Sequence, residues 1–190
     1  MLAEIGQSDR GVSEAERAHL LDPLNVILGV DVGYRRYWAR RSQEAVSPIQ
    51  ETLELDSGFA VGHRYLGQVY EQIGMYEAAI TELRRAAELT GDNPIDLGAL
   101  GHAYAVSGRR VESLQILEQL RRLSAKRYVS AFEFALIHAG LGERDAALYW
   151  LIEAFHQHSG WMLHLKVDPR LDPLRTDPRF QELVRRVGLA

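Results

Sequence analysis

The stretch AVGHRYLGQVYEQIGMYEAAITELRRAAELTGDN, residues 60–93, decides the fold of this chain. It contains two segments with apolar residues at helical spacing, and Gly74 separates them. When the chain is shifted against itself by thirty-four residues, Gly67 falls on Gly101 and Gly74 falls on Gly108 without a gap. The sequence therefore predicts a repeated pair of helices joined by a tight turn.

The small residues and the caps of this stretch have a physical explanation. Gly67 and Ala79 stand where the two antiparallel helices cross, and larger side chains there would push the backbones apart. Gly74 follows the first helix, in the place where a left-handed residue ends many helices. Asn93 is expected to cap the next helix, with Pro94 at its first position.

The same register divides the rest of the chain. Ser13 is expected to cap a helix that runs to about Leu21, where the proline of Asp22-Pro23 ends it. The organisation that follows is a flexible N-terminus (1–11), a half repeat (12–25), four repeats (26–59, 60–93, 94–127 and 128–161) and a C-terminal cap (162–190).

The first whole repeat, residues 26–59, departs most from the pattern. Arg36 stands where the second and third repeats have tyrosine, a place taken by His138 in the fourth, and Arg40 replaces the glycine that ends the first helix. Pro48 falls early in the second helix.

The pattern changes after Trp161. Apolar and polar residues alternate to Val167, but no other strand is available for pairing, so a short buried helix is expected there. Three Asp-Pro pairs then follow, and each is expected to start a helix with an aspartate cap. A last helix from Pro178, stopped by Gly188, is expected to lie over the end of the stack.

The repeated helix pairs resemble the tetratricopeptide repeat family over residues 12–161, about four-fifths of the chain. The resemblance implies an all-α right-handed superhelix, an α-solenoid, whose inner face is lined by the leading helices. It also implies a protein-interaction module. The tail, residues 166–180, is similar to the closing segment of repeat arrays in bacterial multidomain regulators, so a fragment of such a regulator is an alternative. The residues that carry the family motif are His63, Leu66, Gly67, Tyr70, Ala79 and Leu83.

The family's groove positions can be transferred to this sequence residue by residue. The resulting groove begins aromatic, becomes polar and narrows to small residues, which suits a protein or peptide partner anchored by apolar side chains. An alternative is that Tyr34, Tyr37 and Trp38 only pack against residues 12–21. The predicted groove residues are Val30, Tyr34, Tyr37, Trp38, Arg64, Gln68, Glu71, Gln72, His102, Phe132, Glu133 and Leu136.

Composition and charge exclude several other classes of function. The net charge of −4 leaves no broad basic surface for nucleic acid, and the absence of cysteine excludes disulfides and thiolate chemistry. No apolar run is long enough to span a membrane, and residues 1–10 do not form a signal peptide, so a cytoplasmic protein is expected.

No pattern in the sequence indicates catalysis or a cofactor. There is no nucleophile turn and no phosphate-binding glycine loop, so an enzyme is not expected. His156 and His158 stand two apart on a helix and point in different directions, which argues against a metal site that would include His164. The basic group at Arg35, Arg36, Arg40 and Arg41 is interpreted as a salt-bridged surface, because several glutamates lie nearby, and a site for an acidic partner is the alternative.

Three hypotheses for the function remain. The leading one is an adaptor that binds a protein segment in the groove. The second is homodimerisation through the half repeat near residues 12–21, where a missing helix leaves an apolar face. The third, RNA binding of the kind shown by related thirty-five-residue repeats, conflicts with the spacing and the acidic balance.

Overall fold

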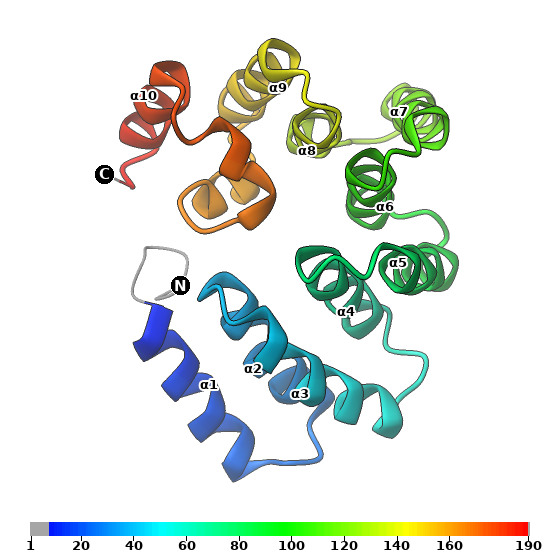
Figure 1. Cartoon of the computed structure of the whole chain (residues 1–190), viewed down its shortest axis with the longest axis vertical. Coiled ribbons are helices and arrows are strands. Elements are labelled where there is room, and N and C mark those ends of the chain that lie inside the picture. Colours follow the sequence, from blue (N-terminus) through cyan, green and yellow to red (C-terminus); the bar gives the residue numbers. More distant parts are fainter. Residues whose placement is uncertain (1–7, 190) are drawn as a thin grey trace. The chain divides into compact units, whose positions relative to one another are not determined.

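The structure, a computed structural model, describes residues 8–189, and every regular element in this range is a helix. The chain divides into two compact units, one ending at Asp92 and the other beginning at Asn93. Figure 1 shows the helices following one another as antiparallel pairs. The first unit contains α1 (Ser8–Leu21), α2 (Val26–Trp38), α3 (Ser42–Leu55), α4 (Ala60–Gln72) and α5 (Tyr76–Thr90).

The second unit contains two further helix pairs and a C-terminal segment. In both units each leading helix packs extensively against the helix that follows it. The predicted helix–turn–helix units are therefore confirmed. The elements are α6 (Pro94–Val106), α7 (Arg110–Ser124), α8 (Ala131–Gly140), α9 (Arg144–His156), the 3₁₀ helices η1 (Gly160–His164) and η2 (Pro169–Leu174), and α10 (Pro178–Arg186).

The four leading helices end in the same hydrogen-bonded turn. In the second repeat, the Gly74 N–H donates to the Glu71 carbonyl, and the Met75 N–H donates to the Tyr70 carbonyl. This is a Schellman motif, in which the residue after the helix takes the left-handed conformation. The left-handed residues at these four turns are Arg40, Gly74, Gly108 and Gly142, with φ values of 66°, 79°, 80° and 75°. The turn is thus kept in the first repeat although arginine replaces glycine.

The two other irregular residues of the first repeat are Arg36 and Pro48, and Arg36 compensates for a hydrogen bond that Pro48 cannot make. Pro48 lies inside α3 and has no N–H, so it cannot donate to the carbonyl of Glu44 four residues earlier. Arg36 supplies the missing donor, because its Nη1 lies 2.8 Å from that carbonyl oxygen. Its Nη2 donates to Glu16 on α1 at 2.7 Å. The Arg36 guanidinium on α2 therefore connects this helix to α1 and to the unpaired carbonyl that proline leaves in α3.

His138 replaces the same tyrosine in the fourth repeat. In a Schellman motif the first residue after the left-handed one usually makes an apolar contact with the last turn of the helix. Here the contact is polar, since His138 Nδ1 lies 2.7 Å from Glu143 Oε2. Arg110 on α7 also donates to Glu143, and these two partners lower the pKa of the Glu143 carboxyl.

The close crossing of paired helices is confirmed. A Cβ added at Gly67 would lie 2.5 Å from Leu83 Cγ and 3.0 Å from the Ala79 carbonyl oxygen. In the third repeat the small place of Ala79 is taken by Ser113, whose buried hydroxyl donates to the Gly101 carbonyl at 3.0 Å. The close crossing therefore restricts the volume of the side chains at these positions. In the third repeat, Ser113 also adds a hydrogen bond between the helices.

Two of the predicted helix starts are wrong. The first described helix begins at Ser8, and Ser13 lies inside it with its hydroxyl donating to the Asp9 carbonyl, so Ser13 is not the cap. Residues 8–11 of the expected flexible N-terminus are thus helical, and residues 1–7 lie outside the described part. Asp172 does not start a helix either, because Pro173 continues η2 and Asp172 pairs with Arg175.

The other two Asp-Pro pairs do start helices. Asp168 accepts from the Arg170 N–H and Asp177 from the Arg179 N–H, and a proline occupies the first turn in each case. Burial opposes ionisation of Asp168, but the charge and hydrogen bonds of Arg170 outweigh it and lower the pKa of this carboxyl.

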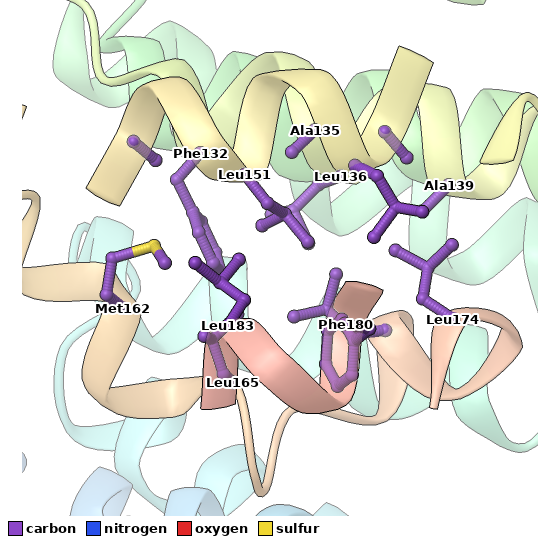
Figure 2. Packing of buried hydrophobic residues seen from close by; sticks show 14 of the residues in the cluster. Phe132, Ala135, Leu136, Ala139, Leu151, Met162, Leu165, Leu174, Phe180 and Leu183 are labelled. Atoms are coloured by element: carbon purple, nitrogen blue, oxygen red, sulfur yellow. The ribbon is translucent and has the colours of Figure 1, made fainter. Parts of the chain in front are cut away.

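The C-terminal segment packs on the last helix pair. The expected short helix after α9 is the 3₁₀ helix η1, and α10 begins at Pro178 and is followed by Gly188 at φ 81°. Figure 2 shows this segment facing α8 and α9 across one hydrophobic core. The buried side chains in this core include Phe132, Leu136 and Leu151 from the helix pair and Met162, Leu165, Leu174, Phe180 and Leu183 from the segment.

Candidate functional site

Most of the predicted groove residues are buried. Tyr34 is half-buried and Gln72 is exposed. The side chains exposed by less than a tenth are Val30, Tyr37, Trp38, Arg64, Gln68, Glu71, His102, Phe132, Glu133 and Leu136. Their role as partner contacts stays a prediction, and the accessible part of the predicted groove lies in the first unit.

Aromatic rings from two leading helices meet in the first unit. The Tyr34 ring centroid lies 3.7 Å from that of Trp38 on the same helix and 3.9 Å from that of Tyr65 on α4, with the two tyrosine rings stacked. We call Tyr34, Trp38 and Tyr65 the aromatic cluster. Tyr34 therefore contacts the next leading helix, whereas the alternative had it packing only against residues 12–21.

Two guanidinium groups flank the aromatic cluster. The Arg35 Cζ lies 5.8 Å from the Trp38 ring centroid, and the Arg64 Cζ lies 5.2 Å from that of Tyr65. Arg35 is also held by Asp31 at 3.1 Å. Cations placed over aromatic faces hold the rings in position.

Tyr65 was not among the predicted groove residues. A signal for it exists, because the thirty-four-residue register places Tyr65 on the row of Asp31, three residues before Tyr34. Residues three apart on a helix share a face, so the two rows lie on the same side of the leading helices.

The basic group of the first repeat is a salt-bridged surface, as interpreted from the sequence. Arg35 pairs with Asp31, Arg36 with Glu16 and Arg41 with Glu44. The hydrogen bond to Arg41 lowers the pKa of Glu44. A shallow hollow of about 460 Å³ lies beside this surface and is lined by residues 40–44 with Gln72 and Ile73.

His102 and Glu133, two predicted groove residues of the second unit, lie where α6 and α8 pack together. A Cβ added at Gly98 would collide with the Glu133 carboxylate, and one added at Gly140 would lie 3.0 Å from the His102 ring. The glycines allow the leading helices to approach closely, and these polar side chains fill the space between them.

Phe132 belongs to the core beneath the C-terminal segment. Its ring is 1% exposed and stacks with Trp161 at 6.3 Å between centroids. Leu136 lies in the same core, where Figure 2 shows it among the side chains that face the segment. The chain's own C-terminal residues therefore occupy this part of the predicted groove.

The described residues gave no group of three histidine, cysteine, aspartate or glutamate side chains that could hold a metal. None of the helices within residues 8–189 has both the length and the apolar character needed to cross a membrane.

An exposed apolar surface surrounds the turn between α1 and α2. Leu20, Leu21, Leu24 and Ile27 are 78%, 82%, 77% and 65% exposed. Single exposed apolar residues are common, but four of them around one short turn indicate an interaction surface. The expected apolar face of the half repeat thus lies at the C-terminal end of α1, because Val12 and Ala15 are buried.

Comparison with solved structures places this helix arrangement among known folds. A tetratricopeptide repeat protein of Thermus thermophilus, TTC0263, superposes with a TM-score of 0.67 at 17% identity, over 87% of this chain and 91% of that chain. The chain has the tetratricopeptide-repeat fold. MamA has this fold in common with it, with a TM-score of 0.54 at 21% identity over 80% of this chain and 90% of that chain.

YrrB, a tetratricopeptide repeat protein with an unusual peptide-binding site, is similar with a TM-score of 0.52 at 18% identity, over 92% of this chain and 91% of that chain. No family model and no curated protein sequence matches the chain. The likeness is thus one of fold.

Proposed function

We propose that this chain is a non-enzymatic adaptor that holds a protein segment against the leading helices of its first unit. The observation that carries the proposal is the aromatic cluster, in which two successive repeats contribute stacked rings. Tyr34 and Tyr65 are half-buried, so part of each ring is accessible. Partly exposed aromatic rings on a rigid support are typical anchors of protein interfaces.

The chemistry of the cluster favours a partner that presents an apolar side chain next to an acidic one. The tyrosine rings offer apolar stacking surface, and Arg35, whose guanidinium lies over the Trp38 ring, is a partly exposed cation of the same cluster. Gln72 is the exposed polar residue at the end of α4 and adds hydrogen-bonding capacity. A peptide-binding site is described for YrrB, which has the same fold.

The experiment compares partner capture by three variants. Proteome-derived peptides are screened against the wild-type chain, and binding of each hit is then measured with Tyr34→Ala, Tyr65→Ala and Tyr76→Ala. Tyr76 is a matched control, since it is an exposed tyrosine of the same unit on the trailing helix α5. Loss of an anchor ring should weaken binding by about 2 kcal/mol, or roughly 30-fold.

The proposal fails if all hits bind the three variants equally. It also fails if no peptide binds above the background of an unrelated protein. Arg64 and Gln68 are poor choices for this test, because both are buried and their variants would change the fold as well as the surface.

The exposed apolar turn favours homodimerisation as a second candidate. A second copy of this chain is the occupant that matches the surface, because an apolar patch can complement itself about a two-fold axis. Burying a leucine side chain contributes about 1.5–3 kcal/mol, whereas association costs about 4–15 kcal/mol, so a weak dimer is expected.

Sedimentation at rising concentration tests this candidate. A dimer that forms at high micromolar concentration should be lost in Leu21→Glu, but not in Leu163→Glu, which places the same charge on an exposed leucine of the second unit. A wild-type chain that stays monomeric over this range excludes the candidate.

A further inference from the structure

The second unit contains a small hollow that was not expected from the sequence. It has a volume of about 290 Å³, at the lower end of the range for ligand pockets, and so has room for one side chain of a partner. Its lining consists of Tyr128, Ser130, Ser159, Gly160, Trp161 and His164.

Two helix ends bring the serines of this hollow together. Ser130 caps α8, with its hydroxyl accepting from the Phe132 N–H. His158 takes the left-handed conformation at φ 52°, and the Ser159 N–H donates to the Ala154 carbonyl, which ends α9. The two hydroxyl oxygens then lie 2.8 Å apart, and both residues are more than nine-tenths buried.

The serine pair has one hydroxyl proton more than it can use internally. Each hydroxyl carries one proton, and the bond between the two oxygens consumes one of them. The Phe132 N–H donates to Ser130 and consumes none. Within residues 8–189 the second proton has no acceptor, and buried hydroxyls normally find one. A ligand carbonyl in the hollow would satisfy it.

Aromatic rings form most of the walls of the hollow. Trp161 is stacked with Phe132 on the core side. His164 donates from Nδ1 to the Trp161 carbonyl at 3.2 Å, and its ring centroid lies 5.2 Å from that of Trp161. Tyr128 is 67% exposed and forms the outer wall. No carboxylate, lysine or arginine lines the hollow, so it has no partner for a charged side chain.

We propose that this hollow binds a proline residue of a protein segment. The pyrrolidine ring would lie between Tyr128 and Trp161, and the spare serine proton would be donated to the carbonyl beside it. Proline is the residue whose backbone offers an acceptor and no donor, which matches a site that supplies a donor. Aromatic-lined grooves recognise proline-rich segments because the ring is rigid and loses little entropy on binding.

The first experiment uses the full chain labelled with ¹⁵N and two uncharged peptides. The indole N–H signals of Trp38, Trp150 and Trp161 are followed by NMR during titration with Ac-Ala-Pro-Pro-Ala-NH₂ or with Ac-Ala-Ala-Ala-Ala-NH₂. The proline peptide should shift the Trp161 signal to saturation, with a Kd on the order of 1 mM, and leave the Trp38 signal in place. The alanine peptide should shift none.

Variants separate the two parts of the site. Tyr128→Ala should weaken binding of the proline peptide about 10-fold. Tyr149→Ala should leave it unchanged, since Tyr149 is similarly exposed at 57% on α9 in the same unit. Ser159→Ala leaves Ser130 with a free proton and should bind within 2-fold of wild type, whereas Ser130→Ala with Ser159→Ala removes the donor and should bind about 5-fold more weakly.

Three results would overturn the proposal. They are a Trp161 signal that does not move at 10-fold the expected Kd, equal shifts with the alanine peptide, and unchanged binding in Tyr128→Ala. A double variant that binds the proline peptide as tightly as Ser159→Ala would overturn the role of the spare proton.

Discussion

Arg36 and Pro48 provide a sharp test of how the first repeat is stabilised. The Arg36 guanidinium donates to the Glu44 carbonyl at 2.8 Å because Pro48 cannot. Replacing Pro48 by alanine restores the missing N–H, so the arginine bond becomes redundant. The stabilities of wild type, Arg36→Met, Pro48→Ala and the double variant then form a double-mutant cycle.

The expected magnitudes follow from the two hydrogen bonds of Arg36. A hydrogen bond from a charged donor contributes about 1.5–3 kcal/mol, and the partly exposed pair with Glu16 adds at most about 1 kcal/mol. Arg36→Met should therefore destabilise wild type by about 2 kcal/mol, but the Pro48→Ala background by about 1 kcal/mol. Pro48→Ala alone should stabilise by about 1–2 kcal/mol, because interior proline costs a helix about 3 kcal/mol and Arg36 already offsets part of this.

Urea unfolding measures the cycle. Trp38 is the single tryptophan of residues 1–92, so its fluorescence in a Trp150→Phe, Trp161→Phe background reports on the first unit. The coupling free energy should be about 1 kcal/mol, whereas Arg36→Met combined with Pro173→Ala in η2 should show none. A coupling below about 0.3 kcal/mol would refute the explanation that Arg36 compensates for Pro48.

Three further predictions concern single positions. Arg40→Gly should raise the free energy of unfolding by about 0.5–1 kcal/mol in urea titrations, since arginine is strained at φ 66°, and an unchanged value would contradict this. Gly67→Ala should lower the melting temperature and cost about 1–3 kcal/mol, because the new methyl group would lie 2.5 Å from Leu83, whereas exposed Gly58→Ala should cost less. The bonds from Arg179 lower the pKa of Asp177 from 3.8 to about 2, so ionised Asp177 stabilises the fold above pH 4 and this contribution is lost as the pH falls toward 2. Asp177→Asn should therefore lose less stability than wild type between pH 4 and pH 2, and equal losses would exclude this role.

The repeat pattern predicted the helix pairs because each repeat obeys local rules. Gly67 must be small and Gly74 must be left-handed, and both requirements are visible in the sequence. Asn93 is recognisable as a cap because proline follows it, and its side chain accepts from the Ile95 N–H at 3.0 Å. The misassigned helix start has a local cause too, since the Ser13 hydroxyl bonds a carbonyl of the preceding turn as readily as it caps a helix.

The candidate site was harder to predict because it depends on contacts between repeats. The groove row predicted Tyr34, but Tyr65 became part of the cluster only through a ring contact with the neighbouring helix. Glu133 and His102 were expected to be accessible. Gly98 and Gly140 let α6 and α8, which belong to neighbouring repeats, approach closely around these two side chains. Ser130 and Ser159 are twenty-nine residues apart, so no local pattern could indicate their bond.

The division between Asp92 and Asn93 has a practical consequence for studying this protein. Gly91 ends α5 in the left-handed conformation, and Asn93 supplies the cap of α6, so each helix keeps its own cap on its own side of the division. A gene cut between these codons would leave no helix end uncompensated at the new termini. We expect the two halves to be expressible as separate polypeptides, and this would allow peptide binding at the aromatic cluster and at the serine hollow to be measured independently.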